Sequence, residues 1–295
     1  MEANIMQSVN HLATPPLERG GDSSIGGLLL ESGKITPESA ERVLRMQKEL
    51  GIRFGEAAQR LGLVTEADIQ QALARQFDYP YLQPGEGRFA PQLVAAYQPF
   101  SPQVEVLRAV RSQLMLRWFA RGRKSLVVLG MDGGDGASMF ASNLAVVFSQ
   151  LGERTLLVDA NLRHPKQTEI FDVASKHGLS DVLAGRAELD CIAHVDAFVA
   201  LSVLAAGTQA PNPAELLSRG AFASVATQLE ARYEVVLYDV AAFNVAPDAV
   251  AVAARTGGVL LVARKHKTRL ADIAAMKEQM GQSGVEVVGS VMVDY

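Results

Sequence analysis

A glycine-rich run separates an apolar stretch from an amphipathic stretch near the middle of the chain. Gly133, Gly134 and Gly136 can adopt positive φ, so successive backbone N–H groups can converge on an anion where the next helix begins. A complete phosphate-binding loop ends in Gly-Lys-Ser or Gly-Lys-Thr, whereas this one ends Gly136-Ala137-Ser138. Ser138 offers a hydroxyl to Mg²⁺, but Ala137 supplies no cation. The expected nucleotide contacts are Gly133, Gly134, Asp135, Gly136, Ala137, Ser138 and Met139.

Two acidic residues follow apolar, strand-like runs. Asp159 ends TLLVD and is followed by Asn161 and Arg163, and Asp239 ends YEVVLYD. In open parallel sheets, ligands bind at the carboxyl ends of the strands, so these residues and the glycine run are expected to meet at one edge. The alternative is a strand–helix turn that binds no ligand, and the glycine run alone does not decide between the two.

Strand-like and helix-like runs alternate from residue 104 onward. The predicted strands are 125–130, 155–159, 201–205, 234–239, 258–263 and 286–293. The predicted helices are 104–120, 138–151, 179–185, 213–231, 247–254 and 268–281. Continuous apolar strands separated by helices indicate an α/β fold, with a mostly parallel sheet and helices on both faces.

An internal repeat precedes this region. Residues 24–47 and 53–76 align at an offset of 29 residues, with matching glycines, threonines and glutamines. In each copy a short helix is expected to end at a glycine, and Thr36 or Thr65 is expected to cap the helix that follows. Two such units predict a small, mainly helical domain.

The composition and the positions of proline and glycine suggest four segments. Residues 1–23 are polar and predict a flexible tail, 24–83 the helical repeat domain, 84–103 a proline-rich linker, and 104–295 the α/β domain. The net charge of −4 gives no sign of a nucleic-acid partner. The single cysteine, Cys191, excludes an internal disulfide and fits a reducing compartment. No signal peptide or membrane-spanning run is evident, so we expect a cytoplasmic protein that reaches the membrane through a partner.

Residues 101–295 resemble the cytoplasmic domain of bacterial tyrosine kinases of exopolysaccharide export, within the P-loop ATPases that include the ParA and MinD proteins. Within that family, the sequence resembles the chain-length-determinant kinases of the EpsG type. The resemblance rests on the glycine loop, the strand-end aspartates and the blocks GLSDVLAGRAEL, AAGTQAPNPAELL and GGVLLVARKHKTRL. It also includes a Glu-x-x-Arg-x-x-Arg helix, which implies homo-oligomerisation through Glu105, Arg108 and Arg111; the alternative is that these three residues form a solvated surface.

The resemblance implies ATP or ADP with Mg²⁺ as the ligand. It implies catalytic roles for Asp159, Asp239, Ser138 and Arg163, with Asp159 as base for a tyrosine hydroxyl and Ser138 and Asp239 on the metal. The sequence departs from the family at Ala137 and Asn161, at the Val-Ala-Ala that follows Asp239, and at a C-terminal end without a tyrosine cluster. These departures suggest a weak kinase or a pseudokinase.

The repeat resembles the N-terminal domain of type II secretion and pilus-assembly ATPases, the MshEN-like domain, which in some members binds cyclic di-GMP. Ser24 stands where the first copy of the motif has arginine. Glycines at helix ends expose amides to phosphate and arginine grips phosphate, but the same pattern also serves as a scaffold without a ligand. The candidate contacts are Arg53, Gly55, Gly62, Leu73, Gln76, Gly26, Gly33 and Gln47.

Three functions remain open from the sequence. The first is a regulator of exopolysaccharide biosynthesis, weakly active or inactive as a tyrosine kinase, that docks on a membrane-embedded chain-length regulator, the co-polymerase. The second is an active autokinase in which Arg163, or an arginine of a partner, replaces the missing lysine. The third is a cyclic di-GMP receptor whose P-loop domain serves only in oligomerisation.

Overall fold

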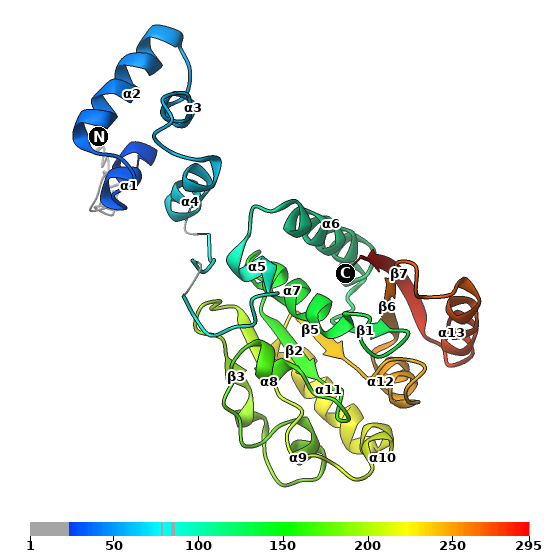
Figure 1. Cartoon of the computed structure of the whole chain (residues 1–295). Helices are drawn as coiled ribbons and strands as arrows, with labels where there is room; N and C mark the ends of the chain where they lie inside the picture. Colours follow the sequence, from blue (N-terminus) through cyan, green and yellow to red (C-terminus); the bar gives the residue numbers. More distant parts are fainter. Residues whose placement is uncertain (1–23, 78, 84–85, 295) are drawn as a thin grey trace, which may run out of the picture. The chain divides into compact units, whose positions relative to one another are not determined.

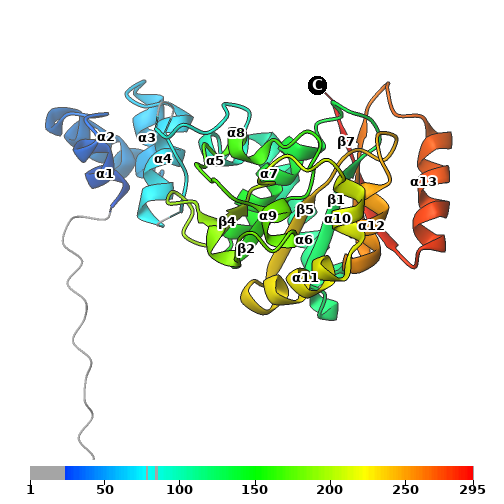
Figure 2. The ribbon, with the colours of Figure 1, turned by 90° about the horizontal axis from the view of Figure 1, so that it is seen from below.

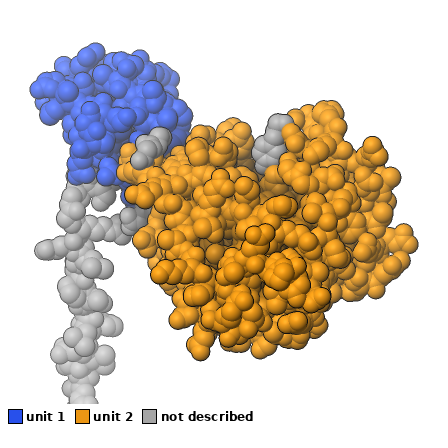
Figure 3. All heavy atoms as spheres, turned by 60° about the horizontal axis from the view of Figure 1, so that its bottom comes forward, with its two compact units in different colours: residues 1–79 blue, residues 80–295 orange. Residues whose placement is uncertain are grey.

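The computed structural model describes residues 24–77, 79–83 and 86–294. The chain divides into two compact units, Met1–Tyr79 and Pro80–Tyr295 (Figure 3). The predicted tail at 1–23 lies outside the described residues. Within the described part of the chain, no helix has the length and apolarity needed to cross a membrane.

The described part of the first unit consists of two helix–turn–helix repeats. Its helices are α1 (Ile25–Glu31), α2 (Pro37–Leu50), α3 (Phe54–Arg60) and α4 (Glu66–Gln76). Gly33 and Gly62, which follow α1 and α3, both have φ of +67°. This left-handed conformation reverses the chain after each short helix and favours glycine.

Each longer helix of the repeat begins at a threonine, as the sequence predicts. The Thr36 hydroxyl accepts a hydrogen bond from the Ser39 amide, and Thr65 forms a complete capping box with Asp68. The small core of the unit contains Leu29 and Val43, both almost fully buried. The capped helix ends and this core fix the angle between the helices of each pair.

The second unit is built on a seven-stranded sheet in the order β3-β4-β2-β5-β1-β6-β7 (Figure 1). The strands are β1 (Ser125–Gly130), β2 (Thr155–Asp159), β3 (Ala193–His194), β4 (Leu201–Leu204), β5 (Val235–Asp239), β6 (Gly258–Arg264) and β7 (Glu286–Val293). All neighbours are parallel except β3 and β4. Six strands match the predicted ones closely, and the two-residue β3 gives no sequence signal.

Helices cover both faces of the sheet (Figures 1 and 2). One face carries α5 (Val94–Tyr97), α6 (Pro102–Arg117), α7 (Ala137–Ser149) and α8 (Gln167–Ile170). The other carries α9 (Leu179–Leu183), α10 (Pro213–Ser218), α11 (Gly220–Arg232), α12 (Asp248–Thr256) and α13 (Leu270–Gln282). The predicted helix 213–231 is in fact two, because Arg219 is extended at φ −71° and ψ 157° and separates α10 from α11.

The segment 84–103, predicted as a linker, differs from that expectation. Leu93 and Ala95 are fully buried in the core that α7 shares with the sheet. The Asn143 side chain of α7 accepts a hydrogen bond from the Ala95 amide (2.8 Å) and donates one to the Gln92 carbonyl (3.2 Å). The prolines prevent a long helix here, but the apolar residues between them bury well. The second unit therefore begins at Pro80 and includes this segment.

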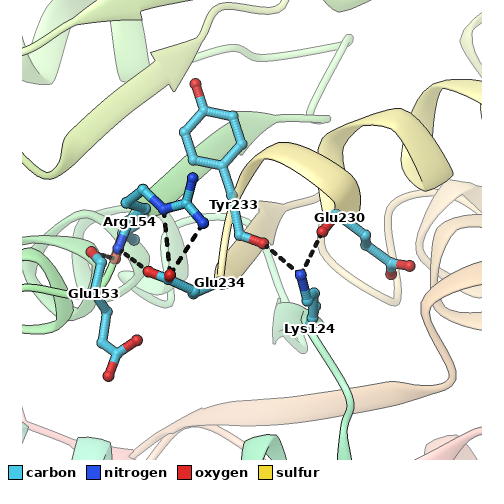
Figure 4. A network of polar contacts seen from close by, with 7 residues as sticks. Lys124, Glu153, Arg154, Glu230, Tyr233 and Glu234 are labelled. Carbon is cyan, nitrogen blue, oxygen red and sulfur yellow. Dashed lines mark hydrogen bonds and ion pairs between the residues drawn. The ribbon is translucent and has the colours of Figure 1, made fainter.

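The amino ends of the central strands are tied together by charged side chains (Figure 4). Lys124, just before β1, donates to the carbonyls of Glu230 (2.7 Å) and Tyr233 (3.2 Å), where α11 ends. A cation at a helix C-terminus satisfies exposed carbonyls and complements the helix dipole. Arg154, just before β2, pairs with Glu234 at 3.1 Å. These contacts lie at the opposite ends of the strands from Asp159 and Asp239, and they fix the register of β1, β2 and β5.

Candidate functional site

The glycine loop joins β1 to α7 in the manner expected of a phosphate-binding loop. Gly134 (φ +83°) and Gly136 (φ +79°) both adopt the left-handed conformation. Gly136 is the N-cap of α7, so the first amides of α7 have no carbonyl partner within the helix and can bind an anion. The Asp135 carboxylate is buried and turned into the loop, where it accepts from the Asp132 amide at 2.7 Å and pairs with Lys267 at 3.4 Å. Asp135 thus shapes the loop.

A cavity of about 460 Å³ opens over this loop. All seven predicted nucleotide contacts, from Gly133 to Met139, line it. Asn161, His164, Lys166 and Glu169 form another part of its wall. The cavity also includes the Val-Ala-Ala run after Asp239 and two residues of the segment before α5. Its size is suited to a small molecule, because ligand pockets commonly fall in the range of about 300–1,000 Å³.

Behind the first turn of α7, a polar network connects Ser138 to the sheet. The Ser138 hydroxyl donates to Asp239 Oδ1 at 3.0 Å. The side-chain amide of Gln167 (Nε2) donates to Asp239 Oδ2 at 2.7 Å and to the Ser138 carbonyl at 3.3 Å. The Ser142 hydroxyl completes the network by donating to Gln167 Oε1 at 2.7 Å. Ser138 therefore lies between the cavity and a fully buried carboxylate.

Asp159 binds the backbone that follows its own strand. Its Oδ2 accepts from the amides of Lys166 and Gln167, each at 2.9 Å, and its Oδ1 accepts from the Asn161 amide at 3.3 Å. The carboxyl group is fully buried and does not line the cavity. In this arrangement Asp159 holds the 161–167 loop in place, and it would have to leave these amides to reach a substrate hydroxyl.

Asp159 and Asp239 lie side by side on β2 and β5. Burial raises the pKa of both carboxyl groups, and the charge of Asp239 raises the pKa of Asp159 further. The amide hydrogen bonds to Asp159, and those from Gln167 and Ser138 to Asp239, act in the opposite direction. Since two buried carboxylates repel each other, the pair holds a proton more tightly than a free aspartate does.

Arg163 is placed differently from the expected catalytic role. Its guanidinium forms two hydrogen bonds with Asp248, from Nε at 2.7 Å and from Nη2 at 3.2 Å. Asp248 is fully buried at the start of α12, and this ion pair raises the pKa of Arg163. Arg163 does not line the cavity. In this arrangement it fixes the 161–167 loop to α12, and it does not replace the missing lysine.

Three cations that the sequence did not single out as ligands lie near the glycine loop. Arg264 donates to the Gly134 carbonyl at 3.3 Å, and Lys267 contacts the Gly133 carbonyl at 3.5 Å. Both come from the end of β6 and the turn after it. Lys166, by contrast, lines the cavity itself. No type or spacing signal marks Lys166, because its position depends on how the 161–167 loop folds back onto Asp159.

The proposed assembly residues on α6 have contacts within the unit. Arg108 pairs with Glu105. Arg111 donates to the Val147 carbonyl of α7 at 2.6 Å. Arg111 thus joins α6 to α7, while Glu105 is exposed.

The candidate cyclic di-GMP residues fall into two groups. The glycines have structural roles: Gly33 and Gly62 take positive φ, while Gly26 and Gly55 lie where a Cβ would meet Phe54 or Ile69 at 3.2 Å. Leu73 packs against the core of the unit. The polar candidates are closer to solvent: Arg53 and Gln76 are exposed, and Gln47 is half-buried.

No family model matches the chain. A putative tyrosine-protein kinase EpsB of Ralstonia nicotianae is 33% identical over 199 residues, which cover 68% of this chain and 26% of that protein. The crystal structure of the chimerical protein CapA2B2 is 31% identical with a TM-score of 0.64, covering 76% of this chain and 97% of that one. The kinase domain of Escherichia coli tyrosine kinase Etk is 28% identical with a TM-score of 0.68, covering 74% and 85%. The P-loop NTPase-like fold is confirmed, and the chain spans about a quarter of the length of the curated relatives it matches first.

Proposed function

Since this chain belongs to the family of bacterial tyrosine kinases, we propose that its second unit binds Mg-ATP or Mg-ADP and acts mainly as a regulator of exopolysaccharide synthesis. The observation that carries the proposal is the cavity over the glycine loop, with Ser138 and Asp239 in place and an alanine at position 137. A scaffold that keeps its anion-binding amides but lacks the lysine supports binding better than phosphoryl transfer.

The residues at the loop fit a magnesium ion held together with phosphate. Mg²⁺ prefers hard oxygen ligands, and in nucleotide sites it takes one or two carboxylates or hydroxyls plus phosphate oxygens and water. Ser138 and Asp239 supply these oxygens, with Ser138 nearer to the cavity. Among the described residues no cluster of three or more His, Cys, Asp or Glu could hold a metal ion unaided. When bound, the ion would neutralise phosphate charge.

The side chains around the loop have separable tasks in this proposal. The backbone amides where α7 begins, at Ala137 and Ser138, bind phosphate oxygens. Gln167 fixes Asp239 and Ser138 relative to each other. Asp159 positions the 161–167 loop, which forms one wall of the cavity, so we assign it a positioning role in place of the role of base.

Restoring the lysine tests the proposal. We expect Ala137→Lys to strengthen ADP binding by the full chain about tenfold to a hundredfold, because it adds one charge-assisted hydrogen bond of about 1.5–3 kcal/mol. Ala137→Met is the matched control, since it adds similar length without charge. Autophosphorylation and ATP hydrolysis are measured alongside binding, and we expect both to rise in the lysine variant. If the wild type autophosphorylates measurably, at a rate equal to that of Ala137→Lys, the chain is an active kinase.

The partner and the assembly belong to the same proposal. We infer that the second unit docks on a membrane-embedded chain-length regulator and forms homo-oligomers through α6, where Glu105 is the exposed member of the motif. Light scattering of the full chain measures oligomer size. We expect Glu105→Ala to reduce it, with Glu278→Ala on α13 as the control at an exposed site elsewhere.

A second proposed function, for the first unit, is binding of cyclic di-GMP. The observation in its favour is Arg53, which is exposed at the start of α3 and makes no capping hydrogen bond there. The structural roles of the four glycines argue against a ligand site, because they explain these glycines without a bound nucleotide. Calorimetric titration of the full chain with cyclic di-GMP is the test, with Arg53→Ala expected to lose binding and Arg42→Ala, an exposed arginine on α2, expected to keep it. No heat from the wild-type chain at high micromolar ligand would end this proposal.

A further inference from the structure

The cavity over the glycine loop contains a cation that has no assigned role. Of the described residues that line the cavity, Lys166 is the only lysine or arginine. It shares the wall with Ala137 and Ser138, the positions at which a phosphate-binding loop normally has its lysine and hydroxyl. We propose that Lys166 supplies the positive charge that position 137 lacks and binds a phosphate of the nucleotide. This inference rests on the proposed nucleotide binding.

The backbone of Lys166 is held firmly beside the loop. Its amide donates to Asp159 Oδ2 at 2.9 Å. The next residue, Gln167, is fully buried and donates to the Ser138 carbonyl at 3.3 Å and to Asp239 at 2.7 Å. Lys166 is therefore connected through its amide to the end of β2, and the residue that follows it is connected to the first turn of α7 and to β5. The direction from which Lys166 enters the cavity is set by the fold, and only its side chain has freedom to move.

The Lys166 side chain forms a weak ion pair with Glu169. Its Nζ lies 3.1 Å from Glu169 Oε2, and the two side chains are 54% and 76% exposed. An ion pair between exposed side chains contributes little to stability because water screens it. A nucleotide phosphate carries more charge and would lie in the less solvated cavity, so it competes well with the Glu169 carboxylate.

The other nearby cations are worse placed for this role. Lys267 and Arg264 bind carbonyl oxygens of Gly133 and Gly134, and Lys267 also pairs with Asp135. Both side chains stabilise the shape of the loop and neither lines the cavity. Arg163 is bound to Asp248. Lys166 is therefore the side chain that can reach a ligand in the cavity without dismantling the loop.

The pairing with Glu169 allows a test with effects of opposite sign. Lys166→Ala keeps the backbone amide that binds Asp159, and we expect it to weaken Mg-ADP binding by the full chain about tenfold to a hundredfold. Glu169→Gln removes a carboxylate from the cavity wall and releases Lys166, so we expect it to strengthen binding about two- to fivefold. Lys176→Ala, at another exposed lysine of the same unit, is the matched control and should leave affinity unchanged.

The double variant separates a phosphate contact from mere screening of Glu169. If Lys166 binds phosphate, Lys166→Ala weakens ADP binding by a similar factor in the Glu169→Gln background. If Lys166 only neutralises Glu169, its removal has no effect there, and the inference is wrong. Adding Ala137→Lys to Lys166→Ala should restore the affinity. Inorganic pyrophosphate serves as a second probe, and its binding should fall with that of ADP.

Failure of this inference can be told apart from failure of the proposed function. If the wild type binds Mg-ADP and Lys166→Ala binds it equally well, nucleotide binding stands and the role of Lys166 does not. If neither the wild type nor Ala137→Lys binds Mg-ADP, the proposed function is refuted and this inference with it. Thermal unfolding of each variant confirms that the fold is unchanged, which is expected because the Lys166 side chain is largely exposed.

Discussion

Replacing Asp239 by asparagine should make the protein more stable, although it removes the carboxylate that we propose as a ligand of Mg²⁺. Asp239 and Asp159 face each other on neighbouring strands, and both are fully buried. Adjacent strands lie about 5 Å apart, and two charges at that separation repel by about 3 kcal/mol at an effective dielectric constant of about 20. Asparagine removes that repulsion. The Ser138 hydroxyl can turn to accept a hydrogen bond from the new amide, so little is lost.

The stability that Asp239→Asn gains over the wild type should increase as the pH rises. Burial raises the pKa of both carboxyl groups in the folded state, whereas the unfolded chain has ordinary aspartate values near 3.9. In the wild type, the stability linked to the proton that the Asp159–Asp239 pair retains is therefore present at low pH. It is lost as the pH rises through the raised pKa of the pair. Asp239→Asn should differ little from the wild type at pH 5. At pH 8 it should be more stable by about 3 kcal/mol, which for a unit of this size is about 6–12 °C in Tm.

Thermal unfolding of wild type and Asp239→Asn at pH 5 and pH 8, without nucleotide or metal, measures this difference. The matched control is Asp248→Asn, which also alters a fully buried aspartate but removes the partner of Arg163. That variant should lose about 1.5–3 kcal/mol. If Asp239→Asn is destabilised equally at both pH values, the two carboxylates do not repel each other as described, and the reasoning is refuted.

Two further predictions concern the positions of other elements. Asn143→Ala should destabilise the second unit by about 1–3 kcal/mol and speed proteolysis between residues 80 and 103, because it leaves the Ala95 amide buried without its acceptor. Unchanged cleavage would mean that the Asn143 hydrogen bond is not what holds this segment in place. Thr65→Ala should destabilise the first unit by about 1 kcal/mol by removing the capping box of α4, as measured by denaturant unfolding of the full chain, and Thr65→Ser should largely preserve stability.

The sheet could be predicted from the sequence because its strands are continuous apolar runs bounded by clear breaks. The elements that escaped prediction are short or lack a periodic signal: β3 has two residues and α8 has four. The break between α10 and α11 was missed because the helical pattern continues across Arg219. The prolines of the segment 84–103 predict a linker, and its alanines give no sequence signal of their burial.

The sequence predicts those parts of the candidate site in which residues of a suitable chemical type stand at the end of a strand or the start of a helix. Glycines before a helix and aspartates at strand ends identified the loop, Ser138 and the buried pair, which the structure brings together. The roles of Arg163 and Lys166 were not predictable, since each depends on a distant partner. Arg163 is bound to Asp248, 85 residues away along the chain. Lys166 enters the cavity because its loop folds back onto the end of β2.

The segment before α6 has a practical consequence for anyone who wishes to excise the second unit. Ala90 and Gln92 form part of the cavity wall, and the Ala90 amide donates to the Ile170 carbonyl at 2.8 Å. A recombinant fragment cut at residue 104 would strip away that wall and uncover the apolar flank of α7. Nucleotide affinities obtained on such a fragment would describe a damaged binding site, so an expression boundary at or before Pro80 is the sound choice.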